Sequence, residues 1–398
     1  MTKLTIDDLD LKDKRVLTRV DFNVPLNDNL EVADDTRIRA ALPTINKIID
    51  SHGKAILMSH LGRPKGQVIE SMRLAPIVRR LSQLLDKEVK YIPDCIGEVV
   101  ENTVNKLQHG EVLLLENLRF YKEETDNDPE FAKKLAKLGD IYINDAFGTA
   151  HRAHASTEGV TKYFEQRAAG YLMQKELMYL GEAIENPKRP FVAILGGAKI
   201  SGKIDVIDNL LNKVDALLIG GGMTYTFLKA QNIGIGNSLV EEDRIQLAKD
   251  VLNKAIAQKI NFNLPSDHLI ANEVTETAKT QVSEAPAIPS GWVGVDIGPN
   301  TIKQFHSILR DARTVIWNGP MGVFEINKFA KGTIEIARIL AEITGQGATT
   351  VVGGGDSVAA LAKAGVTDKV THVSTGGGAS LEFLGGIKLP GIEALTDR

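Results

Sequence analysis

The chain has 398 residues, of which 43% are hydrophobic and 25% are charged, and its formal net charge is −4. This length exceeds the size at which one hydrophobic core usually stops growing, so we expect two domains. The balanced charge offers no basic surface for nucleic acid or an anionic membrane, and neither is expected as a partner. A single cysteine, Cys95, excludes an intrachain disulfide, and the acidic N-terminal segment does not resemble a signal peptide, so a cytoplasmic location is expected.

Four strands are predicted in the first half of the chain, each a short apolar run followed by a helix-length amphipathic segment. They lie at Arg15–Val20, Lys54–Ser59, Glu111–Glu116 and Asp140–Asn144. This alternation is typical of an α/β protein in which helices cover both faces of a parallel sheet. Ligands of such sheets bind beyond the carboxyl ends of the strands, so the residues that follow each run are the candidate site.

Polar and basic side chains follow these four strands. A lone arginine is usually a solvated surface residue, but guanidinium groups that converge from separate strands match the geometry of phosphate and carboxylate. We therefore predict a bowl for a small polyanion. No cysteine or carboxylate accompanies the histidines as it would in a zinc site, so a metal is disfavoured here. The side chains concerned are Asp21, Asn23, Arg37, His60, Arg63, Arg119, His151, Arg152 and His154.

A helix is predicted at Tyr171–Asn186, between the two halves. Apolar residues at Met173, Leu177, Leu180 and Ile184 follow a 4-3-4 spacing and form one helical stripe. Two prolines, at positions 187 and 190, end the pattern. We interpret this segment as the interdomain helix and as a candidate hinge.

The second half of the chain is rich in glycine, with 28 of the 36 glycines after residue 169. Glycine-rich segments that follow predicted strands expose backbone N–H groups, and several of them predict an anion-binding rim for a nucleotide. The alternative is that these glycines only form tight turns between strands and helices. The predicted strands are Phe191–Leu195, Ala216–Gly220, Thr314–Asn318, Thr349–Gly353 and Val370–Ser374.

The segment GGAKISGK at residues 196–203 satisfies the first seven positions of the P-loop pattern when read from Gly197. The pattern requires Ser or Thr next, but the chain has Ile204. The residues leave open whether this is a P-loop without its hydroxyl or another phosphate-binding segment. No G-x-G-x-x-G occurs after these strands, which disfavours a dinucleotide-dependent dehydrogenase. A hinged protein that binds an anion without turnover remains the alternative from another class.

Nine motifs together resemble the phosphoglycerate kinase family, in order from residue 15 to the end. They are RVDFNVP, DDTRIRAALPTI, SHLGRPKG, LLLENLRF, DAFGTAHRAHAST, GGAKISGK, IWNGPMGVFE, GGGDS and STGGGASLE. The resemblance implies two doubly wound parallel-sheet domains joined by a hinge helix, in a monomer. The expected boundaries are 1–171 for the acid-substrate domain, 172–186 for the helix and 187–383 for the nucleotide domain, with 384–398 packed back on the first.

The resemblance also implies reversible phosphoryl transfer from 1,3-bisphosphoglycerate to Mg-ADP, which gives 3-phosphoglycerate and Mg-ATP in glycolysis. Domain closure and charge stabilisation would suffice for this reaction, because a carboxylate or phosphate acceptor is already ionised at neutral pH and needs no general base. The expected cofactor is Mg²⁺, with ADP and ATP as co-substrates.

Matching positions supply the expected site residues. The acid substrate would contact Asp21, Phe22, Asn23, Arg37, His60, Leu61, Gly62, Arg63, Arg119 and Arg152. The nucleotide would contact Lys199, Lys203, Gly220, Gly221, Gly222, Asn318, Glu325, Gly354, Gly355, Asp356 and Ser357, with Asp356 as the metal ligand. The catalytic groups would be Arg37, Lys199, Gly376, Gly377 and Gly378.

Two of these residues have a plainer interpretation. Arg37 would pair with Asp34 or Asp35 on a surface loop, and Asp356 would cap a helix. The chain also departs from the family pattern: Gly202 stands where Asp is common, no Pro follows Gly97, and His268 replaces an apolar residue.

Overall fold

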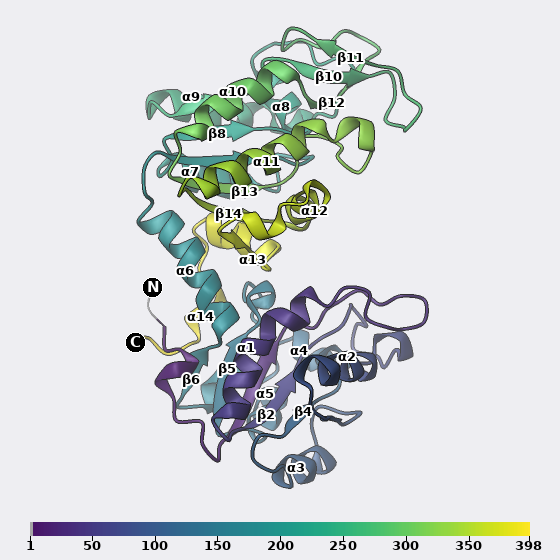
Figure 1. The fold of residues 1–398 in the computed structure, drawn as a ribbon, viewed down its shortest axis with the longest axis vertical. Coiled ribbons are helices and arrows are strands. Elements are labelled where there is room, and N and C mark those ends of the chain that lie inside the picture. Colours follow the sequence, from purple (N-terminus) through teal and green to yellow (C-terminus); the bar gives the residue numbers. More distant parts are fainter. Residues whose placement is uncertain (1–2) are drawn as a thin grey trace. The chain divides into compact units, whose positions relative to one another are not determined.

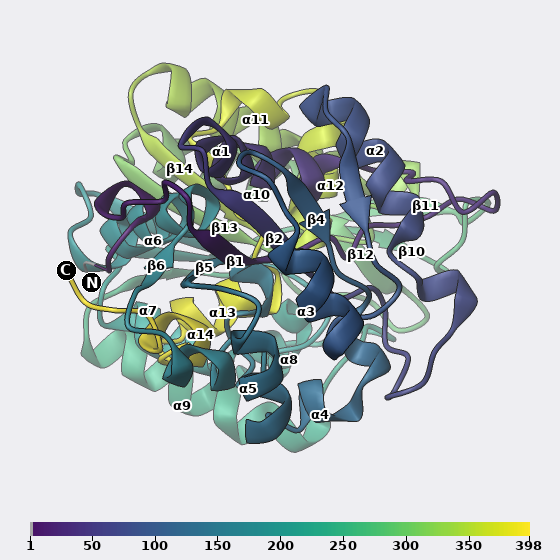
Figure 2. The same cartoon turned by 90° about the horizontal axis from the view of Figure 1, so that it is seen from below.

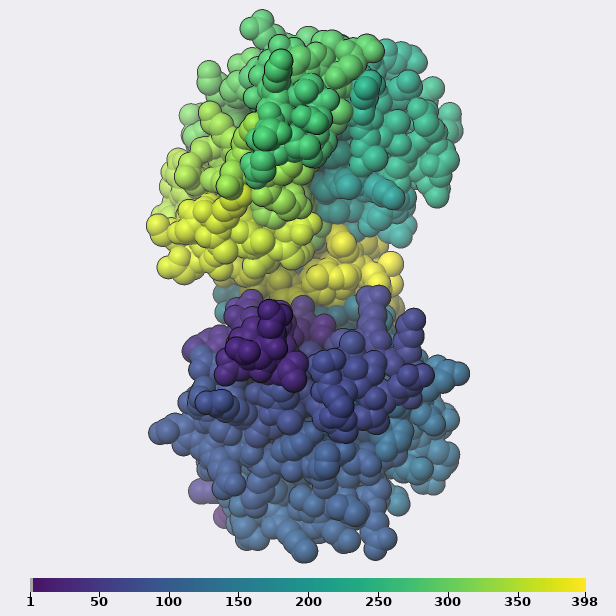
Figure 3. Space-filling model, turned by 90° about the vertical axis from the view of Figure 1, so that its right-hand side faces the viewer, coloured from purple at the N-terminus to yellow at the C-terminus, as the bar shows by residue number. Residues whose placement is uncertain are grey.

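The computed structural model describes residues 3–398, which divide into two compact units. Unit 1 contains the chain up to Met178 together with Lys388–Arg398, and unit 2 contains Tyr179–Ile387. Each unit has its own six-stranded sheet (Figure 1). In the space-filling view, residues coloured purple to blue make up most of the visible surface of unit 1, and residues coloured teal to yellow that of unit 2 (Figure 3).

The sheet of unit 1 is entirely parallel, with the strand order β3-β4-β2-β1-β5-β6. All four strands predicted in this half are confirmed, with bounds that differ by at most two residues. Two three-residue strands, β3 and β6, were not predicted, because runs this short carry almost no periodicity. The bounds are β1 Arg15–Val20, β2 Lys54–Met58, β3 Val89–Tyr91, β4 Val112–Leu114, β5 Ile141–Asp145 and β6 Arg167–Ala169.

Helices cover both faces of this sheet. Figure 2 shows α1 and α2 on one face and α3 and α5 on the other. On the first face, alternate strand residues such as Val16 and Leu57 pack against Ile45 and Leu81 of these helices. The larger helices are α1 Thr36–Asp50, α2 Ala75–Leu85, α3 Glu98–Asn105 and α5 Pro129–Ala136. The shorter ones are α4 Lys122–Thr125 and α14 Pro390–Glu393, with 3-10 helices η1 Ile6–Asp8, η2 Glu70–Met72, η3 Leu118–Phe120, η4 Phe147–Thr149 and η5 Gly159–Tyr163.

The first and last described segments of the chain lie side by side in unit 1 (Figures 1 and 2). The Leu4 amide donates to the Thr396 carbonyl at 2.8 Å, and the Thr396 amide donates to the Arg167 carbonyl at 3.0 Å. The Asn144 side chain, at the end of β5, donates to the Gly391 carbonyl at 3.0 Å. The C-terminal segment therefore packs against the same sheet as the N-terminal one.

The main sheet of unit 2 is also parallel, with the order β15-β14-β13-β7-β8-β9. Its predicted strands are confirmed, three of them residue for residue, although Val370–Ser374 narrows to a two-residue strand. The two units thus have the expected doubly wound α/β architecture. The bounds are β7 Phe191–Leu195, β8 Ala216–Ile219, β9 Asn261–Asn263, β13 Thr314–Asn318, β14 Thr349–Gly353 and β15 His372–Val373.

A three-stranded antiparallel sheet in unit 2 was not predicted. Its order is β11-β10-β12, with β10 His268–Ala271, β11 Thr280–Ser283 and β12 Val293–Ile297. Gly294 and Asp296 interrupt the apolar pattern of β12, and β11 is mostly exposed. Sequence periodicity therefore gave no clear strand signal here.

The helices of unit 2 bury an apolar core against its parallel sheet. Trp317 of β13 and Ile194 of β7 pack with Phe305, Ile336 and Leu361 of three helices. The helices are α7 Ile204–Leu211, α8 Met223–Ala230, α9 Ile245–Ala257, α10 Pro299–Arg310, α11 Lys331–Gly345, α12 Gly355–Ala364 and α13 Gly378–Leu384. The 3-10 helices are η6 Glu242–Arg244, η7 Asn327–Phe329 and η8 Thr367–Lys369.

A helix between the two halves is confirmed: α6 spans Tyr171–Glu185 and ends before Pro187. Its first turn is tied to unit 1. The Asp145 carboxylate accepts the amides of Leu172 and Met173 at 2.9 and 3.2 Å, and the Thr44 hydroxyl accepts the Tyr171 amide at 2.8 Å. These bonds satisfy amides that a helix start otherwise leaves without partners.

Candidate active site

The first residues of the predicted bowl follow β1. The Arg37 guanidinium, on α1, donates to the Asp21 carboxylate at 3.0 Å and to the Asn23 carbonyl at 3.2 Å. The plainer interpretation of Arg37 is wrong. Asp34 accepts from Thr36, and Asp35 pairs with Arg39 and Arg80. Arg37 therefore turns toward the end of β1.

The segment after β2 joins the same cluster. The Gly62 amide donates to the Asn23 side chain at 2.9 Å, and Arg119 donates to the Gly62 carbonyl at 2.8 Å. Gly62 has φ +64, and a Cβ there would come within 2.9 Å of the Met72 sulfur, so the loop needs glycine. The segments that follow β1, β2 and β4 therefore meet at the loop around Gly62.

Arg119 is the most desolvated arginine of the predicted set, with 7% of its surface exposed. Burial, and after it the positive charges of Arg19 and Arg152, lowers its pKa to about 10. Its Nε has no hydrogen-bond partner within residues 3–398. A buried cation with an N–H donor that lacks a partner lowers the stability of the fold, unless an anion accepts that hydrogen bond. This position therefore fits a phosphate or carboxylate ligand.

Asn117 organises the loops around Arg119 and was not predicted. Its side chain accepts from the amides of Leu61 and Arg119 and donates to the carbonyls of Leu61 and Met72. The side chains of Phe22 and Leu61 lie in the core of unit 1, so at these two predicted positions only the main chain is available to a ligand.

Two other predicted arginines have fewer contacts. Arg63 is exposed, and the described part of the chain offers it no hydrogen bond. Arg152 is half-buried, and its Nε contacts the His151 ring at 3.2 Å. Both side chains are thus less constrained than Arg119.

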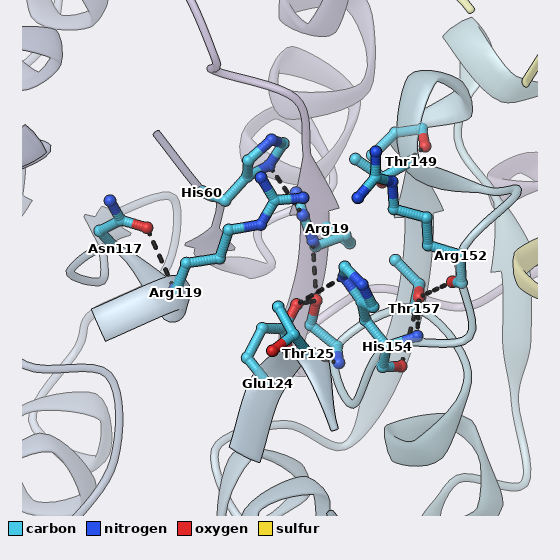
Figure 4. A network of polar contacts seen from close by, with 12 residues as sticks. Arg19, His60, Asn117, Arg119, Glu124, Thr125, Thr149, Arg152, His154 and Thr157 are labelled. Carbon is cyan, nitrogen blue, oxygen red and sulfur yellow. Dashed lines mark hydrogen bonds and ion pairs between the residues drawn. The ribbon is translucent and has the colours of Figure 1, made fainter. Parts of the chain in front are cut away.

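A buried polar network lies under the bowl (Figure 4). Arg19, inside β1, contacts the His60 ring and the Ser156 hydroxyl, and that hydroxyl contacts Glu124. Burial and then the neighbouring arginines lower the pKa of His60 well below its ordinary value and that of His154 to about 4. Arg19 and Glu124 were not predicted. Arg19 lies within a predicted strand, where a charged residue was a usable signal.

In unit 2, the GGAKISGK segment follows β7 but is not a P-loop. The Glu241 carboxylate accepts the amides of Ile200 and Ser201 at 2.7 and 3.2 Å and the Ser201 hydroxyl at 2.6 Å. Burial raises the pKa of Glu241, but these bonds hold it below its ordinary value. A P-loop gives such amides to phosphate, whereas here a carboxylate of the same chain takes them.

Lys203, at the end of this segment, reaches the end of β13. Its ammonium donates to the Asn318 carbonyl at 2.7 Å and to the Asn318 side-chain oxygen at 2.6 Å. Asn318 pairs with Leu195 of β7 and Gly353 of β14, so it lies where the strand order reverses. Its Nδ2 is buried without a partner in the described chain and faces Gly354. Burial lowers the pKa of Lys203, and the opposing effect of Asp356 is smaller, so that the pKa lies at about 7.

A pocket of about 340 Å³ opens beside these residues, with mostly apolar walls. Four predicted nucleotide residues line it: Gly221, Gly222, Glu325 and Asp356. Its apolar walls were not predicted, because several come from the unpredicted β12 and its surroundings. They include Tyr225, Leu239, Val274, Val293, Gly294 and Val323.

The other glycines of the rim are packed tightly. A Cβ on Gly220 would lie 2.5 Å from the Met321 sulfur, and Gly221 has φ +68. The Ser357 hydroxyl accepts the Gly319 amide at 2.7 Å, which fixes the turn after β13 against α12. Gly354 precedes α12 with φ 89, and Gly355 begins it. Tight turns therefore account for several of these glycines. The start of α12 nevertheless remains exposed at the rim.

Asp356 is exposed in the first turn of α12, but Gly354 occupies the N-cap position and no side chain caps this helix. The capping interpretation is therefore wrong. Asp356 makes no hydrogen bond or ion pair within the described residues, and Lys199 is also exposed. A lone exposed carboxylate fits magnesium, which commonly takes one or two protein carboxylates together with substrate phosphates.

The segment Gly376–Gly378 leads into α13, which packs against α7. The Ser374 hydroxyl contacts the Ser380 hydroxyl at 2.6 Å and accepts the Gly376 amide at 3.2 Å. Gly377 has φ +51, which favours glycine. The loop is thus held by two buried serines, which were not predicted.

Across residues 3–398, none of the helices has both the length and the apolar character needed to span a bilayer. The same range contains no group of three His, Cys, Asp or Glu side chains arranged as a metal site.

Comparisons with known proteins agree on one family. The sequence-family profile described as phosphoglycerate kinase matches residues 6–387. Phosphoglycerate kinases of Chlorobium limicola and Chloroherpeton thalassium are each 59% identical over 397 residues, with full coverage of both chains. The solved structure of phosphoglycerate kinase from Coxiella burnetii superposes with a TM-score of 0.90 at 43% identity, covering 98% of each chain. The structure from Pyrococcus horikoshii has a TM-score of 0.84 at 34% identity and the same coverage.

Proposed function

Since this chain belongs to the phosphoglycerate kinase family, and is therefore a phosphotransferase of glycolysis, we propose that it moves a phosphoryl group reversibly from 1,3-bisphosphoglycerate to Mg-ADP. The products are 3-phosphoglycerate and Mg-ATP. The observation that carries the substrate assignment is Arg119, a buried cation whose Nε lacks a partner in the described chain. An anionic substrate would accept a hydrogen bond from this Nε and balance the charge of the guanidinium.

On the acid-substrate side, we propose that the phosphate of 3-phosphoglycerate binds Arg119, Arg63 and Arg152, with His60 as a further donor. Asp21 and Asn23 then receive the hydroxyl and carboxyl end. The main chain at Phe22, Leu61 and Gly62 completes the wall. Guanidinium groups suit this role because they bind phosphate and carboxylate through paired hydrogen bonds.

On the nucleotide side, the apolar pocket takes the base, and Glu325 takes the ribose. The phosphates then run toward Lys203, Asn318 and the start of α12, where free backbone amides favour anions. The contacts along this path are Gly220, Gly221, Gly222, Gly354, Gly355 and Ser357. Asp356 would hold Mg²⁺, which would supply positive charge to balance part of the charge of the nucleotide phosphates.

During transfer, we propose that Arg37, Lys199 and the amides of Gly376, Gly377 and Gly378 stabilise the phosphoryl group. Phosphoryl transfer asks mainly for positioning and charge stabilisation, and no residue is needed as a general base because both acceptors are already ionised. The groups invoked come from both units. We therefore propose that domain closure, with α6 as the hinge, assembles them and excludes water.

The proposal also includes domain roles and assembly. The acid substrate belongs to the first domain and the nucleotide to the second, with residues 1–171, 187–383 and the returning 384–398 assigned as in the resemblance. A monomer suffices because one chain carries both half-sites, and a glycolytic role fits the cytoplasm. Sedimentation of the active protein as a dimer would contradict the monomer.

A coupled assay tests the activity. Purified protein, 3-phosphoglycerate and Mg-ATP are mixed with an enzyme that consumes 1,3-bisphosphoglycerate, and ADP formation is followed. We expect ADP to form only when both substrates are present. Binding of 3-phosphoglycerate without any turnover would favour the hinged binding protein instead.

A further inference from the structure

We propose that Glu124, acting through Ser156 and Arg19, positions His60 as a neutral hydrogen-bond donor with its proton on Nε2. The effect on substrate binding rests on the function proposed above, but the tautomer itself does not. All four residues belong to unit 1. Hydrogen bonds join them in one continuous line, of which Figure 4 labels Arg19, His60 and Glu124.

The direction of each hydrogen bond in this line is fixed. Arg19 is fully buried and can only donate, so its Nε donates to the Ser156 hydroxyl at 2.9 Å. That hydroxyl has one proton, which it donates to the Glu124 carboxylate at 2.6 Å. Arg19 also donates to the Val20 carbonyl. The guanidinium is therefore held from two sides.

The tautomer of His60 follows from the next contact. An Nη of Arg19 lies 3.1 Å from His60 Nδ1, and a guanidinium has no lone pair to offer. His60 Nδ1 must therefore accept, and the ring proton lies on Nε2. An imidazolium would carry a proton on both nitrogens and would clash with this donor.

The charges around His60 also favour the neutral ring. It is 4% exposed, and burial is the main cause of its lowered pKa. The groups that face it are Arg19 from β1, Arg119 from η3, Arg37 from α1 and His154 from the segment after β5, and each of them opposes a positive charge on the ring. No carboxylate contacts His60 among the described residues.

Glu124 is the anchor of the line. It is fully buried, and its two oxygens accept the Ser156 hydroxyl and, at 2.9 Å, the Ser156 amide. His154 Nδ1 lies 3.9 Å from the same carboxylate. Burial raises the pKa of Glu124, while Arg19 and the Ser156 bonds lower it. Because no water reaches this carboxylate, its loss leaves the Ser156 hydroxyl proton without its acceptor and removes the negative charge that faces Arg19.

The consequence for function is a donor that does not change with pH. A neutral Nε2–H donates equally to an anion throughout the range from about pH 6 to 8, whereas an ordinary histidine loses a charge there. Affinity for 3-phosphoglycerate would then vary only with the ionisation of the ligand and of groups other than His60.

The tautomer is tested directly by long-range ¹H–¹⁵N NMR on the full chain labelled at histidine. We expect His60 to show a protonated Nε2 and an unprotonated Nδ1, with no titration between pH 6 and 8. A His60 that carries its proton on Nδ1, or that becomes doubly protonated in this range, overturns the proposal.

The role of the line is tested with Ser156→Ala, which removes the bridging hydroxyl, and with Glu124→Gln as a second variant. Ser82→Ala is the matched control, because its hydroxyl accepts the Val89 amide in the same unit away from the bowl. We expect the His60 ¹⁵N shifts to move toward a mixed tautomer in the first two proteins only. The Kd for 3-phosphoglycerate should rise roughly 2- to 10-fold in both, as expected for one misplaced hydrogen bond.

The outcomes separate this inference from the proposed function. Unchanged His60 shifts in both folded variants overturn the roles of Ser156 and Glu124, and changed shifts with an unchanged Kd overturn the effect on binding. If the unmodified protein shows the expected tautomer but binds no 3-phosphoglycerate, the proposed function fails and the assigned tautomer stands.

Discussion

The Lys203 ammonium donates to both oxygens of Asn318, at 2.7 Å to the carbonyl and 2.6 Å to the side chain, where the strand order of unit 2 reverses. The two residues are 115 positions apart in the sequence. This contact aims the lysine at the start of α12, beside the apolar pocket. The contact distinguishes this segment from a P-loop, and under the proposed function the lysine binds the nucleotide phosphates from this position.

Lys203→Ala should therefore weaken ADP and ATP binding while it leaves 3-phosphoglycerate binding nearly intact. Loss of a hydrogen bond to a charged group costs about 1.5–3 kcal/mol, or roughly 10- to 150-fold in Kd. Titration calorimetry with each ligand measures this. Lys249→Ala, at an exposed position on α9, is the control and should bind like the parent. Equal nucleotide affinity in Lys203→Ala and the parent would remove Lys203 from the site.

Asp356→Asn should raise the magnesium concentration needed for half-maximal activity. A helix cap would instead predict a loss of stability of about 0.5–2 kcal/mol, but Gly354 holds the cap position. We therefore expect a melting temperature close to that of the parent. A lowered melting temperature with unchanged magnesium dependence would show that the carboxylate serves the helix and not the ion.

Arg37→Ala should lower kcat far more than it raises KM, because the positive charge of Arg37 is proposed to stabilise the phosphoryl group during its transfer. Removal of a preorganised donor of this kind typically costs on the order of 10²–10³ in rate. Arg37→Lys should recover only part of the loss, since an ammonium cannot reproduce the guanidinium fork. Steady-state kinetics with both substrates varied decides the matter, and an effect on KM alone would leave Arg37 as a substrate anchor.

His268→Leu should make the protein more resistant to acid. Burial lowers the pKa of His268 to about 4, although Asp267 raises it in turn, and its Nε2 has no partner within residues 3–398. The unfolded chain binds this proton below about pH 6.5 and the folded chain only below about 4, so stability is lost as the pH falls through this window. The expected loss is on the order of 3 kcal/mol.

Calorimetric melting between pH 6.5 and 4 measures this effect. The melting temperature of the His268→Leu protein should fall less steeply with acidification than that of the parent. Lys249→Ala, at an exposed position on α9, is the control and should leave the slope unchanged, because an ordinary lysine does not titrate between pH 6.5 and 4. Parallel slopes for the parent and His268→Leu would mean that His268 is protonated in the folded state or already solvated.

Most of the parallel strands were predictable from the sequence because they are buried on both faces, although β3, β6 and β9 were not predicted. Phe191–Leu195 is fully apolar and is buried at every position, and such a short continuous apolar run is typical of a strand in a covered parallel sheet. β12 carries Gly294 and Asp296 within five residues and escaped detection for that reason. Its absence from the prediction also hid the part of the pocket that Val293, Gly294 and Val295 line.

The candidate site was predictable to the extent that its residues follow strands. Arg37 and Arg119 lie on elements next to strand ends, and the resemblance placed them without knowledge of their contacts. Glu124 and Glu241 are different. Each is one acidic residue among several neighbouring ones, and only the tertiary structure brings them to Ser156 and to the amides of Ile200 and Ser201. Sequence patterns carry no signal for such long-range partners.

Phosphoryl transfer between the two proposed substrates can be observed directly. ³¹P NMR of a mixture of the protein, Mg-ATP and excess 3-phosphoglycerate follows every phosphorus atom at once. We predict that ADP and an acyl phosphate appear together in equal amounts, and that neither forms when 3-phosphoglycerate is left out. The appearance of ADP with inorganic phosphate as the initial product, or of no ADP at all, would contradict the proposed function.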